Sequence, residues 1–196
     1  MAKVAIIYHS GYGHTERLAT SVFEGADAVD GTSTVLIRVD ELPERLAELN
    51  AADAIIFGTP TYMGSASAPF KAFMDSTSVI FAGMGWRDKL AAGFTNSASH
   101  DGDKLNTLTQ LAVFAAQHGM IWINLGLPPG NNSTQGSPDD LNRLGASLGA
   151  MAQSDADAPP DIAPPNSDLE TGRHLGQRVA EAALRWGSAR NASQKR

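Results

Sequence analysis

The sequence predicts an α/β protein in which helices cover both faces of a parallel sheet. Two observations carry this prediction: strand-like and helix-like segments alternate along the 196 residues, and the strand-like segments are nearly continuous apolar runs. Alternation implies right-handed crossovers between parallel strands. Strands buried on both faces must be apolar throughout, as these are. With 42% hydrophobic residues, the chain has enough apolar side chains for one core, so we expect a single domain over residues 1–187.

Five strands and five helices are expected in chain order. Apolar runs predict strands at residues 4–8, 34–39, 54–58, 90–95 and 120–125. Helical spacing of apolar residues predicts helices at residues 15–23, 43–50, 68–77, 103–118 and 169–186. The polar C-terminal residues 188–196 are expected to form a flexible tail.

Residues 126–168 depart from this alternation. The segment is rich in Gly, Pro, Asn and Asp, and it is much longer than a typical loop. Within it, residues 141–151 are apolar enough to pack against the body, whereas the proline-rich residues 158–165 should be extended and stiff. The length leaves three roles open: a surface excursion at the sheet edge, a flap over a site, or a subunit contact.

Composition and charge exclude several classes of function. A net charge of −6 argues against a nucleic-acid or anionic-membrane surface. Because the chain has no cysteine, it has no disulfide, thiolate nucleophile or iron–sulfur cluster. The five histidines are dispersed without metal-ligand spacing, so no metal site is expected. No signal peptide or membrane-length apolar run is present, which favours a cytoplasmic protein.

The turn Ser-Gly-Tyr-Gly-His-Thr-Glu at residues 10–16 joins the first strand to the first helix. Free N–H groups at a helix N-terminus bind phosphate, and Ser10 and Thr15 add hydroxyl donors. Gly11 and Gly13 permit positive φ and close approach of a ligand. An ordinary loop with a helix cap explains the same residues equally well. A P-loop and a standard dinucleotide fingerprint are excluded, because their glycine and lysine spacing is absent.

Two further polar loops follow strands, at the edge where open parallel sheets bind ligands. Gly-Thr-Pro-Thr-Tyr-Met-Gly at residues 58–64 offers hydroxyls, an aromatic ring and a thioether. Thr-Asn-Ser-Ala-Ser-His-Asp-Gly at residues 95–102 offers amide and hydroxyl groups. Three such loops at one edge favour a ligand site over unrelated turns. A phosphorylated planar ligand such as flavin mononucleotide (FMN) fits them.

Residues 10–16, Phe-Gly-Thr-Pro-Thr-Tyr-Met-Gly at 57–64 and Gln-His-Gly-Met at 117–120 together resemble the flavodoxin-like FMN proteins, most closely the WrbA-type NAD(P)H:quinone oxidoreductases. The likeness extends from residue 3 to about residue 186. It implies a three-layer fold with strand order 2-1-3-4-5, FMN as cofactor, NADH or NADPH as electron donor, a quinone-type substrate and a homo-oligomer, either a dimer or a tetramer. The segment 81–86 and the excursion 126–168 are the expected subunit contacts.

The resemblance also implies which residues contact FMN. The phosphate would be held by Ser10, Gly11, Tyr12, Gly13, His14 and Thr15. The ring would be contacted on one side by Pro60, Thr61, Tyr62, Met63 and Gly64. Its far side would face Asn96, Ser97, Ala98, His100 and Asp101, in a loop bulkier than the family's usual Ser-Thr-Gly-Thr-Gly-Gly. Phe81 occupies the position of an aromatic residue that the family places near a neighbouring subunit's active site.

His118 corresponds to the family's histidine beside the ring, where it would donate a proton to a reduced quinone. Without the resemblance, a position just before Gly119 indicates only the C-terminal end of a helix. Three functions therefore stand. The leading hypothesis is an FMN-dependent enzyme that reduces quinones with NAD(P)H in a ping-pong cycle. The alternatives are a flavodoxin-type electron carrier and a binding module that has lost its flavin.

Overall fold

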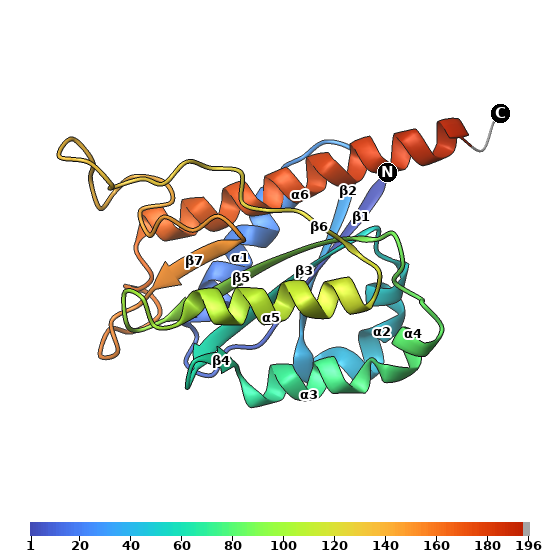
Figure 1. Ribbon diagram of the computed structural model, residues 1–196, viewed down its shortest axis with the longest axis horizontal. Coiled ribbons are helices and arrows are strands. Elements are labelled where there is room, and N and C mark those ends of the chain that lie inside the picture. Colours follow the sequence, from blue (N-terminus) through green and yellow to red (C-terminus); the bar gives the residue numbers. More distant parts are fainter. Residues whose placement is uncertain (194–196) are drawn as a thin grey trace.

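The computed structural model describes residues 1–193, and residues 194–196 lie outside this range. Five parallel strands lie side by side in the order β2-β1-β3-β5-β6 (Figure 1). They are β1 (Ala2–Tyr8), β2 (Thr32–Arg38), β3 (Ala54–Tyr62), β5 (Leu90–Ser97) and β6 (Ile121–Trp122). Along this path the order is the expected 2-1-3-4-5, so the predicted fold class is confirmed. The sheet has seven strands instead of the expected five, because β4 (Ser65–Ala66) pairs with β3 and β7 (Ala150–Gln153) pairs with β5.

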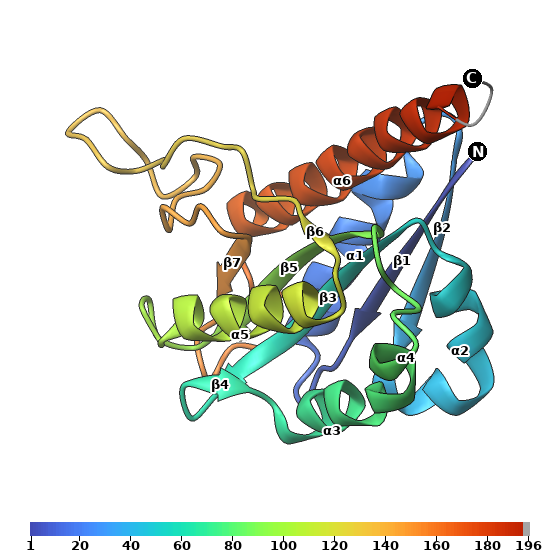
Figure 2. The ribbon, with the colours of Figure 1, turned by 45° about the vertical axis from the view of Figure 1, so that its right-hand side comes forward.

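Helices cover both faces of the sheet, as the two views of Figures 1 and 2 show. One face packs against α1 (His14–Asp27) and α6 (Asn166–Ser193). The other face packs against α2 (Leu42–Ala51), α3 (Ala68–Ser76), the short α4 (Ser78–Ala82) and α5 (Lys104–Gln117). A single 3₁₀ turn, η1 (Val39–Glu41), leads from β2 into α2.

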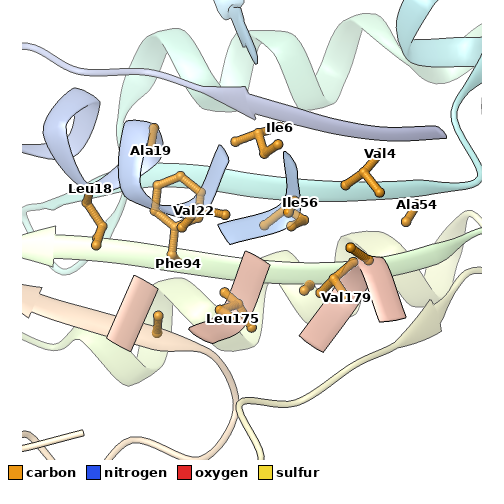
Figure 3. Packing of buried hydrophobic residues seen from close by; sticks show 14 of the residues in the cluster. Val4, Ile6, Leu18, Ala19, Val22, Ala54, Ile56, Phe94, Leu175 and Val179 are labelled. Carbon is orange, nitrogen blue, oxygen red and sulfur yellow. The ribbon is translucent and has the colours of Figure 1, made fainter. Parts of the chain in front are cut away.

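The alternation of side chains along each strand divides the core in two. Val4 and Ile6 of β1 face α1 and α6, where they belong to the cluster in Figure 3 that includes Leu18 and Leu175. Ala5 and Ile7 of β1 face α2, α3 and α5 instead. Both sets are fully buried. The strands are therefore apolar on both faces because each face is covered by helices.

Helices α1 and α6 approach so closely that their backbones touch. A Cβ atom at Gly176 would overlap the carbonyl group of Val22, and one at Gly25 would overlap the carbonyl group of Arg173. Only glycine fits at these two positions. The packing holds the N-terminus of α1, which lies at the carboxyl edge of the sheet, against the rest of the molecule.

The fifth strand position differs from the prediction. A strand was expected at residues 120–125, but β6 ends at Trp122, and the parallel pairing with β5 resumes in β7 (Ala150–Gln153). Residues 123–149 thus leave the sheet between β6 and β7, and part of this loop extends away from the body in Figure 1. The expected packing of residues 141–151 is confirmed, because Ala146 and Ala150 lie in the core.

The loop 123–149 stays ordered around a buried asparagine. The side chain of Asn142 donates to the carbonyl groups of Pro128 and Ala146 and accepts from the backbone N–H of Ala146. Its own N–H donates to Thr171 of α6. Buried polar groups of this kind must be paired to be tolerated. Short-range periodicity contains no sign of such pairing, so the split strand was not predictable from it.

Two further boundaries also moved. Strand β3 continues through Tyr62 and forms a hairpin with β4 (Ser65–Ala66), so residues 59–62 are strand where a loop was expected. Helix α6 begins at Asn166, directly after two prolines, and continues through Ser193. The predicted tail at 188–196 is therefore helical as far as Ser193, and its last three residues lie outside the described range. Within residues 1–193, no helix combines the length and hydropathy that a membrane span requires.

Candidate functional site

A cleft of about 990 Å³ opens at the carboxyl ends of β1, β3 and β5. The three loops singled out from the sequence converge on it, as expected at the edge where the strand order reverses. A fourth segment, from Ser154 to Pro160, completes the lining. The volume of the cleft lies at the upper end of the range of about 300–1,000 Å³ that is usual for small-molecule sites.

The turn between β1 and α1 has the geometry of a phosphate site. Gly13, the N-cap residue of α1, has φ 90° and ψ −24°, and its N–H donates to Ser10 Oγ at 3.0 Å. No side chain of the described residues caps the helix, so the first N–H groups of α1 are left for a ligand. Both Ser10 and Thr15 line the cleft. Helix dipole, N–H groups and hydroxyls therefore favour an anion here.

The β3–β4 hairpin forms the next side of the cleft. Met63 and Gly64 have φ 49° and 77° between paired strands, which is the two-residue turn that favours positive φ at both positions. This turn leaves the Met63 side chain fully exposed at the cleft mouth. Tyr62 contacts Tyr12 edge to face, with ring centroids 6.1 Å apart. A flat apolar ligand would find aromatic and thioether surface at this position.

The end of β5 supplies the polar side of the cleft. Asn96 and Ser97 are buried and line it. The Asn96 Oδ1 atom accepts a hydrogen bond of 2.9 Å from Ser154 Oγ, which leaves its amide N–H groups as donors. Beneath them, Thr61 Oγ1 lies 2.8 Å from the hydroxyls of Thr95 and Thr107. These bonds fix the backbone of both loops against the core.

Lys104, the first residue of α5, holds the loop after β5 from behind. Lys104 is 1% exposed, and its ammonium group donates to Ser97 Oγ, Ser99 O and His100 O, each at 2.8 Å. Burial lowers the pKa of Lys104 to about 8, while the carboxylates of Asp168 and Asp101 act in the opposite direction. The sequence analysis did not single out this residue.

Residues 154–160 contact the phosphate turn directly. His14 Nε2 bonds the carbonyl oxygen of Ala158 at 2.8 Å, and Arg17 Nη1 donates to that of Pro160 at 2.7 Å. The Pro160 ring lies against Gly13, where a Cβ would approach its Cγ to 2.6 Å. Of the three roles left open for the excursion, this segment supports a part in covering the site.

The segment 154–160 is preceded by Gln153, which contacts a buried ion pair between Arg143 and Asp168. Arg143 Nε and Nη2 donate to the two carboxylate oxygens of Asp168, each at 2.8 Å, and both side chains are nearly inaccessible. Asp168 also accepts from the N–H of Gln153. The Gln153 side chain in turn donates to the carbonyl group of Ala98, which lines the cleft. Helix α6, the excursion and the cleft are thereby joined.

Most of the predicted site residues meet at this cleft. Those that line it are Ser10, Tyr12, His14, Thr15, Pro60, Thr61, Tyr62, Met63, Gly64, Asn96, Ser97 and Ala98. Gly11 and Gly13 shape the turn without lining the cleft, and a Cβ on Gly11 would come within 2.6 Å of the Tyr62 hydroxyl. His100 and Asp101 do not line it; both are exposed, and the His100 carbonyl instead accepts from Lys104.

The predicted position of His118 beside the ring is wrong for the cleft of its own chain. Helix α5 begins at the cleft and runs for 14 residues, which carries His118 about 21 Å away, to the opposite edge of the sheet. There its ring lies 2% exposed between Trp86 and Phe114, with Nε2 2.9 Å from Thr77 Oγ1. Burial lowers its pKa. His118 is a core residue at a helix end, which is the alternative reading of its position.

Several lining residues were missed by the sequence analysis. They are Ser99, Gly102, Asp103, Ser154, Ala156, Asp157, Ala158, Pro159 and Pro160. The first three continue the predicted loop after β5 and could have been included by extending it. The remainder belong to the excursion. They follow the end of the predicted loop 95–102 by more than 50 residues in the sequence. The length and composition of the excursion had indicated a flap over a site as one possible role, but not which of its residues would line the cleft.

Comparison with known proteins agrees with this geometry. Residues 3–135 match the family model described as NADPH-dependent FMN reductase. The chain belongs to this family of flavodoxin-like FMN proteins. It is 46% identical over 184 residues to a protein named flavodoxin FldP from Pseudomonas aeruginosa, with 92% of this chain and 96% of that protein covered.

Solved structures extend the likeness to the fold. A flavodoxin, WrbA-like protein from Agrobacterium tumefaciens shares 41% identity and a TM-score of 0.74, with 94% of this chain and 99% of that chain covered. A flavodoxin from the domain Archaea shares 20% identity and a TM-score of 0.64, with 93% and 99% covered, which shows the fold alone. The family and its members support FMN as the cofactor, and the uncapped turn at Gly13 fits its phosphate.

Proposed function

We propose that this member of the FMN reductase family uses bound FMN to pass electrons from NADH or NADPH to quinone-type acceptors. The observation that carries the proposal is the cleft itself. Its phosphate-binding turn, flat apolar side and polar side suit one flavin nucleotide, and its volume of about 990 Å³ supports a second planar molecule at the mouth. A reaction that uses NAD(P)H also fits the cytoplasmic location expected for the chain.

In this proposal the flavin supplies the hydride and electron chemistry, and the protein binds and orients it. The N–H groups of α1, with Ser10 and Thr15, hold the phosphate. Tyr62 and Met63 lie against one side of the ring. Asn96 offers amide donors to the polar edge of the ring, because its Oδ1 is already bonded to Ser154. Donor and acceptor would use the same open side in turn, which predicts ping-pong kinetics.

An electron carrier is the second candidate, and two observations favour it. The relative that is 46% identical is named a flavodoxin. In addition, Tyr12 and Met63 are largely exposed at the cleft mouth, at 76% and 102% of their reference areas, where a protein partner could reach a flavin edge. With His118 outside the cleft, protonation of a reduced quinone would depend on solvent or on other cleft residues.

Anaerobic stopped-flow reduction separates the two functions. The FMN-loaded protein is mixed with NADH or NADPH, and the loss of flavin absorbance near 450 nm is followed; the reduced protein is then mixed with a soluble benzoquinone. We expect both half-reactions to complete within seconds. Negligible reduction by both nucleotides, together with normal FMN binding, would reject the enzyme and favour the carrier. A protein that binds no FMN would reject both.

We also propose that the chain forms a homo-oligomer through α4 and the turn that follows it. Val79, Phe81 and Met84 are exposed there, at 81%, 48% and 40%. Trp86, which was included in the expected contact segment, is instead fully buried and cannot contribute. Sedimentation at micromolar concentration should show a dimer or tetramer that Phe81→Asp weakens. A wild-type monomer under these conditions would contradict the proposal.

A further inference from the structure

Lys104 is a buried cation directly behind the cleft. Its three N–H bonds all go to one loop, and two of the acceptor residues, Ser97 and Ser99, line the cleft. The Ser97 hydroxyl donates a hydrogen bond of 3.0 Å to Ser99 O, so toward the Lys104 ammonium it acts as an acceptor. One layer of side chain therefore separates the positive charge from a ligand in the cleft.

Among the described residues, the Lys104 ammonium has no direct counter-ion. Its three acceptors are neutral, and among residues 1–193 no carboxylate lies within 4.0 Å of the ammonium. The charged groups that act on it are Asp101 of the same loop, Asp168 of α6 and Arg143 of the excursion. Asp168 is already paired with Arg143 through two hydrogen bonds. A buried charge without a counter-ion is costly even when it is hydrogen-bonded, so its presence beside a ligand site points to an anionic ligand.

We propose that Lys104 stabilises the negative charge that FMN gains on reduction, and so raises the reduction potential of the bound flavin. This inference rests on the FMN site proposed above. Transfer of a hydride from NAD(P)H to the oxidised ring leaves NAD(P)⁺ and a reduced ring with one more negative charge. Below its pKa of about 8, Lys104 keeps its proton during this step. It is a positioning residue for the loop and a source of fixed charge for the ring, because the same three bonds serve both roles.

The test compares the affinities of oxidised and reduced FMN in Lys104→Met with those in the wild type. A unit charge acting across about 10 Å at an effective dielectric constant of about 20 changes an equilibrium by roughly tenfold or more. We therefore expect reduced FMN to lose about tenfold more affinity than oxidised FMN. That ratio equals a two-electron potential lower by about 30 mV. Lys104→Arg keeps the charge, so the reduction potential of its bound FMN should stay close to the wild-type value.

Lys3→Met is the matched control. Lys3 lies in β1 at the opposite edge of the sheet and is exposed, so its removal changes net charge equally without affecting the cleft. A second signature comes from pH. Since burial lowers the pKa of Lys104 to about 8, the difference in potential between wild type and Lys104→Met should decline above that pH.

Equal loss of affinity for both redox forms would show that Lys104 only orders the loop, and would overturn the proposal. If Lys104→Met does not fold, the wild-type potential still decides: its slope against pH must steepen above about pH 8, and an unbroken line there would overturn the proposal too. Failure of the wild type to bind FMN would reject the proposed function itself, which is a different result from either of these.

Discussion

Replacing Gly13 by alanine tests the phosphate turn most directly. Gly13 has φ 90°, where an alanine is strained, and the added Cβ would come within 2.6 Å of Pro160 Cγ. Strain of this kind costs about 1–3 kcal/mol. The turn can relieve it by rotating away from positive φ, but its N–H groups then no longer converge on the phosphate. Because binding must restore the strained turn, we expect FMN affinity to fall about tenfold to hundredfold.

Gly31→Ala provides a matched control. Gly31 has nearly the same φ, 87°, but it precedes β2 at the edge opposite the cleft, and a Cβ there would meet only Leu184 at 3.5 Å. Both variants should lose stability in urea denaturation, whereas only Gly13→Ala should lose FMN affinity in a fluorescence titration. The phosphate role of the turn is refuted if Gly13→Ala binds FMN as the wild type does, or if Gly31→Ala weakens binding equally.

Two further predictions concern stability. Arg143→Met leaves the buried Asp168 carboxylate unpaired, which should cost about 3–5 kcal/mol in urea denaturation, and Arg143→Met/Asp168→Leu should recover much of that loss; a cost below about 1 kcal/mol for the single variant would contradict the role of the pair. Burial lowers the pKa of His118, so the unfolded chain binds more protons below its ordinary pKa of 6.5. The contribution of His118 to the free energy of unfolding should therefore be complete above about pH 6.5 and decrease as pH falls toward and through its lowered folded-state pKa. His118→Gln should flatten this dependence between pH 7.5 and 5, and an unchanged pH profile would show that His118 is already free to titrate.

Local sequence determined much of this protein. Apolar runs and helical spacing located all five long helices and the strands that cross the centre of the sheet. A strand buried on both faces is apolar throughout, whereas a helix buried on one face is apolar at every third or fourth residue. The turn at residues 10–16 was readable for a similar reason: a glycine before a helix and flanking hydroxyls have a local conformational meaning. Local sequence placed His118 at the C-terminal end of a helix, where the structure has it, whereas the family resemblance placed it beside the ring.

Tertiary contacts decided the remainder. The fifth strand is split because residues 123–149 are stabilised by the buried hydrogen bonds of Asn142, whose partners include Thr171 on another helix. Pro160 contacts the phosphate turn from more than 140 residues away in the sequence. The burial of Lys104 depends on acceptors that a folded loop directs inward. Pairing and desolvation are properties of groups brought together by the fold, and for that reason periodicity and spacing could not reveal them.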